Sequence, residues 1–499
     1  MMTTIIPLLW IILAIAGTFL FYKFKPKTYE SLLLHKKEAR ELAVQFIKRY
    51  SGIDVSDWDF YAMYWYDRNT VNMLHHLGLL NKVRHILYKW GLVESWRIRF
   101  VRENRSVIIG INSNGEITFY TANLSKKEMG KHKGTFSSPE QLKKELAISD
   151  NGLWAASQFT GAGRKEEDLE NIETYWYIAE SQPVRMKITV EIHNGQIFYI
   201  GSEQEILTED IETAVKKEQM ESTLNMTGVL ASCLAVIAAI IILINLRQNA
   251  GITASILLGA VLFFCNIITI KEDIQLSIVN TYDSRLSIKT VYALGILSAI
   301  LAGLATGFVV YICSLAGHSL SNVLQIAFFE NAAWQFFVGL NVGIGCLGFF
   351  SAIFSWLEKK NWLRISPELS NRTIYLSGFT FKQGLSIGLQ SSIAEETVYR
   401  LLIIPTIWWL SGNWALAIII SSILWAIMHQ GTGFHPRWIR WIQLVIFGII
   451  LGFFFIQFGF LSSLTIHFIY NFILVMKPLW DYTFQKKLKA SETFKQPSV

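Results

Sequence analysis

The sequence predicts an all-α polytopic membrane protein of about nine transmembrane helices with an inserted soluble α+β domain. Two observations favour this fold class. Hydrophobic residues make up 52% of the 499 residues, and the mean hydropathy of +0.34 is too high for an ordinary soluble protein. Polar and charged residues are concentrated in one section, residues 26–222. We therefore expect a multi-pass protein of the cell membrane, surrounded by the lipid bilayer.

Charge and cysteine content exclude other classes of protein. The net charge is +7, which in a membrane protein is attributed to basic loops. The chain has no basic stretch interleaved with aromatic residues, so we expect no nucleic-acid partner. All 4 cysteines lie in apolar segments, so neither a disulfide framework nor a cysteine-based zinc site is predicted.

The first predicted element is a transmembrane helix within residues 1–25. Residues 5–22 are apolar and long enough to span a bilayer. The segment lacks the basic region that precedes the apolar part of a signal peptide, and lysines follow it directly. We therefore expect a retained helix rather than a cleaved signal.

Residues 26–222 are predicted to form one soluble α+β domain, beginning with a helix. The turns Asn114-Gly115 and Asn194-Gly195 each separate two alternating apolar runs, which is a strong hairpin signal. The paired runs are 107–111 with 117–120, and 188–192 with 197–200. The two hairpins indicate an internal duplication. They resemble the PepSY-type domain attached to some membrane proteases; an unrelated α+β domain is the alternative.

From residue 223 to the end the chain is predicted to be mainly transmembrane, and residues 223–370 hold helices of unknown role. The charged stretch 271–290 is expected to be a loop or an interfacial helix. The candidate spans after the first are 226–246, 251–270, 291–314, 332–355, 383–410, 413–430, 440–459 and 461–478.

Basic residues predict the orientation of these spans. They cluster after the third, fifth and seventh spans and in the tail 481–499, and they are absent after the fourth, sixth and eighth. The positive-inside rule then places the C-terminus and residues 26–222 in the cytoplasm. An extracytoplasmic domain is the alternative, because long domains cross a membrane largely regardless of charge and a PepSY-like domain is more often expected outside.

The sixth span carries ionisable residues, each of which costs roughly 2.5–3.5 kcal/mol at the bilayer centre. Glu396 and Arg400 are four residues apart, so they can pair on one helix face. Glu395 points elsewhere and has no local partner, as suits a general base. The structural alternative is a buried ion-pair network. We expect kinked helices near Pro405.

Two further polar elements lie at the end of the seventh candidate span, 413–430, and in the last one, 461–478. Trp425 precedes His429 by one helical turn, and His467 precedes Asn471 by another. Taken singly, His429 could be an interfacial residue, and His467 and Asn471 could form a helix–helix hydrogen bond. His435, just outside its span, is predicted to be a solvated loop residue.

The three elements together, Glu-Glu-x-x-x-Arg, aromatic-x-x-x-His and His-x-x-x-Asn, resemble the CPBP family of CAAX proteases and bacteriocin-processing enzymes, also called the Abi family. The resemblance covers about residues 383–475 and defines a catalytic core at 371–480. All the ionisable positions are present. Trp425 stands where phenylalanine is commoner and keeps an aromatic ring beside the histidine.

The resemblance implies an intramembrane endopeptidase acting on a membrane-embedded or membrane-anchored protein or peptide. Glu395 and His429 would activate the attacking water, and His467 and Asn471 would stabilise the oxyanion. Glu396 and Arg400 would brace the site.

We expect no cofactor, because a carboxylate can act as base without a metal and no His-Glu-x-x-His pair stands on one helix. If a metal is present, Zn²⁺ held by Glu395, His429 and His467 is the alternative.

Two other functions stay open at the level of sequence. Buried Glu and His residues are also typical of transporters and proton relays, but the inverted repeats of such proteins are not found in the sequence. A non-catalytic immunity or binding protein on the same scaffold would keep its function without Glu395.

Overall fold

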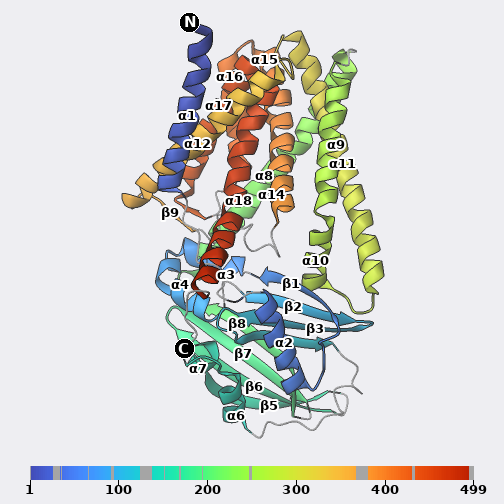
Figure 1. The fold of residues 1–499 in the computed structure, drawn as a ribbon, viewed down its shortest axis with the longest axis vertical. Coiled ribbons are helices and arrows are strands. Elements are labelled where there is room, and N and C mark those ends of the chain that lie inside the picture. The colour runs from blue at the N-terminus through green and yellow to red at the C-terminus, as the bar shows by residue number, and fades with distance from the viewer. Residues whose placement is uncertain are drawn as a thin grey trace.

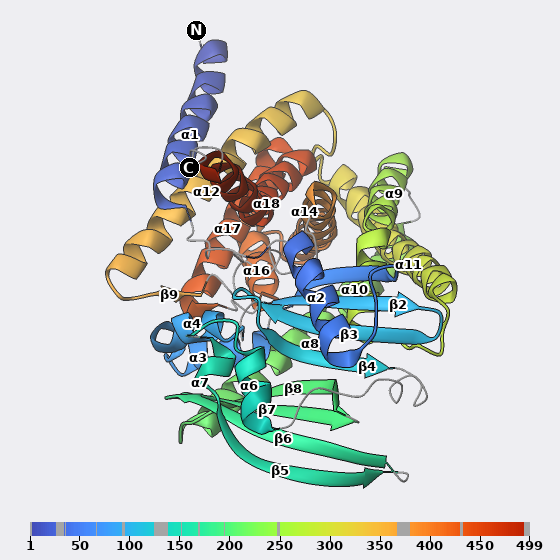
Figure 2. The same ribbon diagram turned by 60° about the horizontal axis from the view of Figure 1, so that its bottom comes forward.

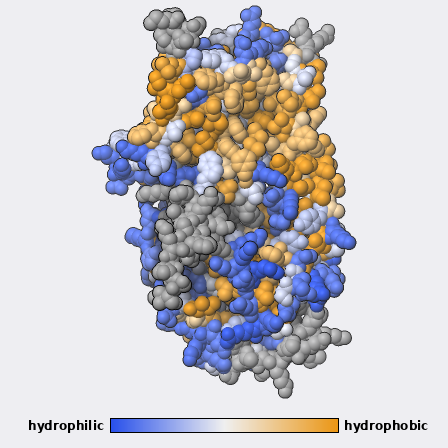
Figure 3. Space-filling view, in the orientation of Figure 1, coloured by the Kyte–Doolittle hydropathy of each residue, from blue (hydrophilic) through white to orange (hydrophobic). Residues whose placement is uncertain are grey.

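The protein has two parts stacked along its long axis, a bundle of apolar helices and a sheet domain (Figure 1). The space-filling view shows the same division, with hydrophobic side chains over the helices and hydrophilic ones over most of the sheet domain (Figure 3). The computed structural model describes residues 2–25, 34, 36–65, 67–91, 95–123, 138–150, 152–167, 170–193, 195–246, 250–366, 380–429 and 433–493.

The sheet domain, residues 36–206, is built around one antiparallel sheet of 8 strands in the order β1-β2-β3-β4-β8-β7-β6-β5. Both predicted hairpins are formed, β3 with β4 and β7 with β8. Gly115 and Gly195 have φ of +82° and +74°, which a glycine adopts without steric cost. Asn194 lies outside the described residues. The strands are β1 (Asp59–Trp65), β2 (Ser95–Arg102), β3 (Arg105–Asn112), β4 (Ile117–Asn123), β5 (Gln158–Glu167), β6 (Glu170–Ser181), β7 (Val184–His193) and β8 (Gln196–Ile206).

The sheet divides into two halves of similar topology. Strands β1 to β4 pair in chain order, β5 to β8 do the same, and the last strands of the two halves, β4 and β8, pair with each other. Helix α2 (Lys36–Ser51) precedes the first half, and α6 (Pro139–Leu146) and α7 (Leu153–Ala156) precede the second. Helices α3 (Arg68–His76) and α4 (Leu80–Lys89) lie between β1 and β2. The internal duplication and the PepSY resemblance both stay predictions.

Each of the nine predicted spans contains helix, but the number of spans is not confirmed. Five helices among the described residues are long and apolar enough to cross a membrane, or up to six if α9 and α10, bent by 46°, count as one span. The helices are α1 (Met2–Phe24), α8 (Ile211–Leu246), α9 (Ile252–Ile268), α10 (Ile270–Thr281), α11 (Ile288–Val323), α12 (Ala332–Lys359), α14 (Phe381–Glu395), η2 (Glu396–Ile403), α15 (Ile404–Ser411), α16 (Trp414–Ile427), α17 (Arg437–Phe458) and α18 (Phe460–Thr493).

The number of described helices long enough to cross a membrane is smaller than nine for a physical reason. The apolar part of α8 and the whole of α16 are shorter than a bilayer requires. The predicted sixth span is divided into α14, η2 and α15, and it carries three of the ionisable residues discussed above.

The two chain ends lie at opposite ends of the helix bundle. Helix α1 begins at the end far from the sheet domain, and α18 runs towards the end where the sheet domain lies (Figure 1). The C-terminal helix and the sheet domain are therefore on the same side of the bundle. Which side faces the cytoplasm stays a prediction.

Among the described residues, contacts between the sheet domain and the helix bundle include one at α10 and one at the start of α17. Helix α10, predicted as a loop or interfacial helix, packs its Ile274 and Ile278 against Val101 of β2. At the second contact, Arg437 at the start of α17 lies 2.7 Å from His76 Nε2 of α3, measured from Nη2. These contacts join the sheet domain to the loops that connect the membrane helices.

The prediction of a solvated His435 is wrong. His435 belongs to the short strand β10 (Phe434–His435), which pairs with β9 (Arg364–Ile365). Its ring centroid lies 6.3 Å from that of His75 in the sheet domain, and the residue is only partly exposed. A residue 360 positions away in sequence covers it, and no local pattern predicts such a contact.

Candidate active site

The site begins at a break in helix geometry. Helix α14 starts with a capping box formed by Thr380 and Gln383 and runs to Glu395, where the chain changes to the π-helix η2. Pro405 stands at the start of α15 and cannot donate a backbone hydrogen bond into the preceding turn. The kink predicted near Pro405 thus takes the form of a π-helical segment, a feature that is frequent at functional sites.

The break gives adjacent glutamates different surroundings. The Glu395 side chain retains 24% of its exposure, whereas that of Glu396 is fully buried. Glu396 Oε1 lies 3.2 Å from Arg400 Nη1, so the predicted pair forms. The same oxygen lies 2.8 Å from His467 Nδ1. A buried carboxylate with two partners tolerates desolvation that a lone charge would not.

Trp425 of α16 joins the two glutamate environments. The Arg400 guanidinium lies 4.5 Å from the centre of the Trp425 ring, where the ring's negative face stabilises a cation. The indole Nε1 of Trp425 donates to Glu395 Oε2 at 2.5 Å. The ring also contacts His429 and His467, with centroid distances of 4.9 and 5.4 Å.

Both histidines turn Nε2 towards the same oxygen of Glu395. Oε2 lies 3.6 Å from His429 Nε2 and 3.8 Å from His467 Nε2. His429 Nδ1 lies 3.0 Å from the Trp425 carbonyl oxygen, which can only accept, so Nδ1 carries a proton. His467 Nδ1 faces the Glu396 carboxylate in the same way. In the neutral form of each ring, Nε2 is therefore an acceptor on the side of Glu395.

Asn471 completes the group from the next turn of α18. Its Nδ2 lies 2.9 Å from His467 Nε2 and donates to Ser391 Oγ at 3.1 Å. The structure thus brings together Glu395, His429, His467 and Asn471 from α14, α18 and the end of α16. The distances between polar atoms are those of direct or single-water contacts.

Exposure differs across the site. His429 and Glu395 retain 33% and 24% of their side-chain exposure, while His467 retains 1%. The Glu395–His429 side of the group is therefore partly open, and the His467 side is enclosed. Trp441 of α17 donates to the His429 carbonyl oxygen at 3.0 Å and fixes the end of α16.

The donor types of this group would suit zinc. The described residues contain no group of three or more His, Cys, Asp or Glu side chains arranged to hold a metal ion. His467 Nε2, which a metal would need as a ligand, lies 2.9 Å from the Asn471 amide nitrogen.

Two contacts of the site were not predicted. Ser391, which accepts from Asn471, stands four residues before Glu395 on α14, so helical spacing could have identified it. Gly388, three residues before Ser391, lies against Phe468 and Phe472 of α18. Trp441 gives no such signal, because its contact depends on how α17 crosses α16.

Comparisons with known proteins identify the family to which the chain belongs. Residues 377–473 match the family model described as type II CAAX prenyl endopeptidase Rce1-like. The sporulation-killing factor biosynthesis protein SkfC of Bacillus subtilis (strain 168) is 55% identical over 481 residues, which cover 96% of this chain and 96% of that protein. No solved structure matches the chain. The chain therefore belongs to the Rce1-like CAAX endopeptidase (CPBP) family of membrane proteins.

Proposed function

We propose that this protein is an intramembrane endopeptidase that hydrolyses a peptide bond of a membrane-associated protein or peptide. One observation carries the proposal: Glu395 Oε2 lies within 3.6 and 3.8 Å of the Nε2 atoms of two histidines, on the more exposed side of the site. A carboxylate beside two imidazoles can activate a water molecule for attack on a carbonyl carbon.

In the proposed reaction, Glu395 takes a proton from a water molecule oriented by His429 Nε2, and the water oxygen attacks the carbonyl carbon. The proton then passes to the leaving nitrogen as the carbon–nitrogen bond breaks. Trp425 holds the Glu395 carboxylate in place through its N–H. The Asn471 amide supplies a donor to the oxyanion, and His467 supplies a second when Nε2 carries a proton.

We further propose that the reaction needs no metal. Glu396 orients His467 through Nδ1, and Asn471 occupies the position at Nε2 that a metal would require. We expect cleavage to continue after zinc chelators are added. Loss of activity on chelation, with recovery on adding Zn²⁺, would contradict the metal-free reaction.

The name of the 55% identical relative and the position of the site among apolar helices support a proposal for the substrate class. The name of the 55% identical relative assigns that protein to the biosynthesis of a sporulation-killing factor. We propose that this chain likewise cleaves the precursor of a killing-factor peptide while the precursor is held at the membrane. The supporting feature is that Glu395 lies among helices suited to a bilayer.

The test compares membrane and secreted peptides from cells carrying wild-type protein, Glu395→Gln or Glu212→Gln. Glu212 is an exposed carboxylate near the start of α8 and serves as the matched control. We expect an uncleaved precursor to accumulate in Glu395→Gln cells only. The same peptides in all three strains, at equal protein levels, would rule out the proposed activity.

A further inference from the structure

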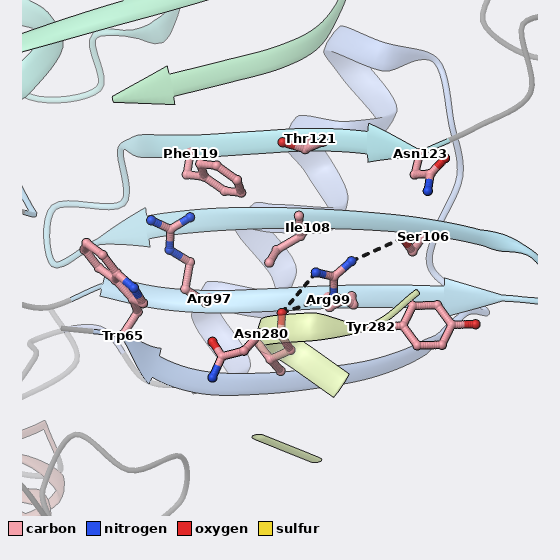
Figure 4. A pocket seen from close by; sticks show the side chains of 11 residues that line it. Trp65, Arg97, Arg99, Ser106, Ile108, Phe119, Thr121, Asn123, Asn280 and Tyr282 are labelled. Atoms are coloured by element: carbon pink, nitrogen blue, oxygen red, sulfur yellow. Dashed lines mark hydrogen bonds between the residues drawn. The ribbon is translucent and has the colours of Figure 1, made fainter. Parts of the chain in front are cut away.

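A cavity of about 370 Å³ lies between the sheet domain and the connection from α9 to α11. Strands β1 to β4 form its floor, and α10 with the residues after it covers one side (Figure 4). Two arginines of β2, Arg97 and Arg99, line it from the same face of the strand. We call this cavity the arginine pocket.

Among the described residues, Arg97 forms no salt bridge. Its guanidinium lies 4.5 Å from the Trp65 ring centre and 4.1 Å from that of Phe119. Within the described part of the chain, its buried Nε has no hydrogen-bond partner. Burial lowers the pKa of Arg97 to about 10, against a smaller opposing effect of Asp67. The side chain is still a cation at neutral pH.

Arg99 is bound by neutral oxygens. Its Nε and Nη2 donate to the Val279 carbonyl oxygen at 3.2 and 3.1 Å, and Nη1 donates to Ser106 Oγ at 3.2 Å (Figure 4). None of these acceptors carries a charge. Two guanidinium groups therefore share one cavity, and the described residues that line it include no carboxylate.

Two carboxylates close in sequence to the lining residues Trp65 and Tyr282 are engaged elsewhere. Asp67 accepts from the backbone nitrogens of Asn69 and Thr70 at 3.1 and 3.2 Å and caps α3. Asp283 pairs with Arg285 at 2.6 Å. An anion that entered the arginine pocket would therefore meet two cations without competition from a resident carboxylate.

The position and lining of the pocket indicate the source of the anion. Val279, Asn280 and Tyr282 come from the segment that joins α9 to α11, so the pocket lies where the helix bundle meets the sheet domain. Aromatic and basic side chains at the boundary between membrane helices and a polar domain are typical of contacts with lipid headgroups. Thr121 and Asn123 add neutral donors, as a phosphate with several acceptor oxygens requires.

We propose that the arginine pocket binds a phosphate group presented by an anionic lipid of the surrounding membrane. The lipid would hold the sheet domain against α10 and would join the two parts of the molecule. This inference is independent of the peptidase chemistry, since no residue of the pocket belongs to the candidate active site.

The test measures binding of short-chain phosphatidylglycerol to the purified full-length protein in neutral detergent. Phosphatidylcholine of equal chain length and inorganic phosphate are the comparison probes. The variants are Arg97→Met, which keeps the stacked aliphatic part, and Arg102→Met, a control on the same strand whose exposed side chain pairs with Asp57. Loss of one charge-assisted contact should weaken phosphatidylglycerol binding about tenfold in Arg97→Met. Arg102→Met should bind like the wild type.

A second pocket variant, Asn280→Asp, tests the proposal even if Arg97→Met fails to fold. Asn280 is exposed on its helix, so the change is tolerated structurally and places a carboxylate at the pocket. It should also weaken phosphatidylglycerol binding. Inorganic phosphate that binds with the same Arg97 dependence would support the phosphate site and identify free phosphate as a ligand. Equal phosphatidylglycerol binding by wild type and both pocket variants would overturn the proposal, as would Arg97-dependent binding of a peptide carboxylate alone.

Discussion

Glu395 and Glu396 are neighbours in sequence and differ in nearly every other respect. Glu396 is fully buried between Arg400 and His467, whereas Glu395 keeps part of its exposure and faces the two Nε2 atoms. Adjacent helical residues point about 100° apart, so the sequence alone predicts this separation. The depth of burial could not be predicted, because it depends on α18 packing against α14.

Removal of Arg400 should destabilise the protein strongly. Arg400→Ala leaves the Glu396 carboxylate buried without its cation, which costs roughly 3–5 kcal/mol. We expect a lower thermal midpoint and a lower folded yield in detergent. The double variant Glu396→Leu/Arg400→Met removes both charges and should recover much of the loss. An Arg400→Ala protein as stable as the wild type would contradict the bracing role.

Trp425 has two separable roles. Trp425→Phe removes the N–H that Glu395 accepts and keeps a ring against Arg400, so activity should fall about tenfold with little change in thermal midpoint. Trp425→Ala removes both contacts and should lower stability as well. Wild-type cleavage by Trp425→Phe would show that the indole hydrogen bond does not position the carboxylate.

At the scale of the elements, small residues set how closely the helices approach. A Cβ added to Gly348 of α12 would lie 2.0 Å from the Gly17 carbonyl oxygen of α1, and one on Gly317 of α11 would lie 2.4 Å from the Leu401 carbonyl oxygen in η2. Close packing through glycine is a common feature of membrane helices. Helix α11 is thus packed directly against the π-helical segment that carries Arg400.

Gly317→Ala should therefore disturb the active site from a distance. The added methyl must push α11 away from η2, because the atom it meets is backbone. We expect at least a tenfold loss of cleavage together with a lower thermal midpoint. Gly388→Ala is the matched control, since the atoms that its Cβ would meet first belong to side chains, the Phe468 ring at 3.3 Å and Phe472 Cβ at 3.4 Å. Equal effects of the two substitutions would argue against a special contact at Gly317.

Elements with local signals were predictable, and contacts between distant segments were not. The Asn-Gly turns predicted both hairpins because the turn fixes the pairing of its flanking strands. The pairing of β4 with β8 joins strands far apart in sequence, and nothing local encodes it. The spacing of His467 and Asn471 predicted their shared direction, but the contact of Asn471 with Ser391 needed the packing of α18 on α14.

At the scale of the whole molecule, a cluster of histidines and arginines joins the sheet domain to the helix bundle. His75 of α3 is buried and faces His76, His435 of β10, Arg364 of β9 and Arg437 of α17. Burial, followed by these neighbours, lowers the pKa of His75 to about 3. The pKa of His435 is lowered by burial and then by Arg364, Lys217 and His76.

This cluster should make the protein less stable in acid. The pKa of His75 is about 3 when folded and about 6.5 when unfolded, so the unfolded chain binds more protons between these values. Stability is then fully present above about pH 6.5 and is lost as the pH falls towards 3.

We expect the thermal midpoint to drop by at least about 5 °C between pH 7.5 and pH 5. His75→Leu should flatten this dependence, and His85→Gln, at an exposed position on α4, should not. Identical pH profiles for the wild type and His75→Leu would contradict the role of the cluster.

The most direct measurement is cleavage of the accumulated precursor by purified full-length protein in lipid nanodiscs. Wild type, Glu395→Gln and Glu212→Gln are compared, and the thermal midpoint of each protein is measured to show that the three are equally stable. We expect Glu212→Gln to cleave at the wild-type rate and Glu395→Gln to lose activity by at least about 100-fold, since its side chain can no longer accept the proton of water. Cleavage by Glu395→Gln at the wild-type rate would contradict the assignment of Glu395 as the base.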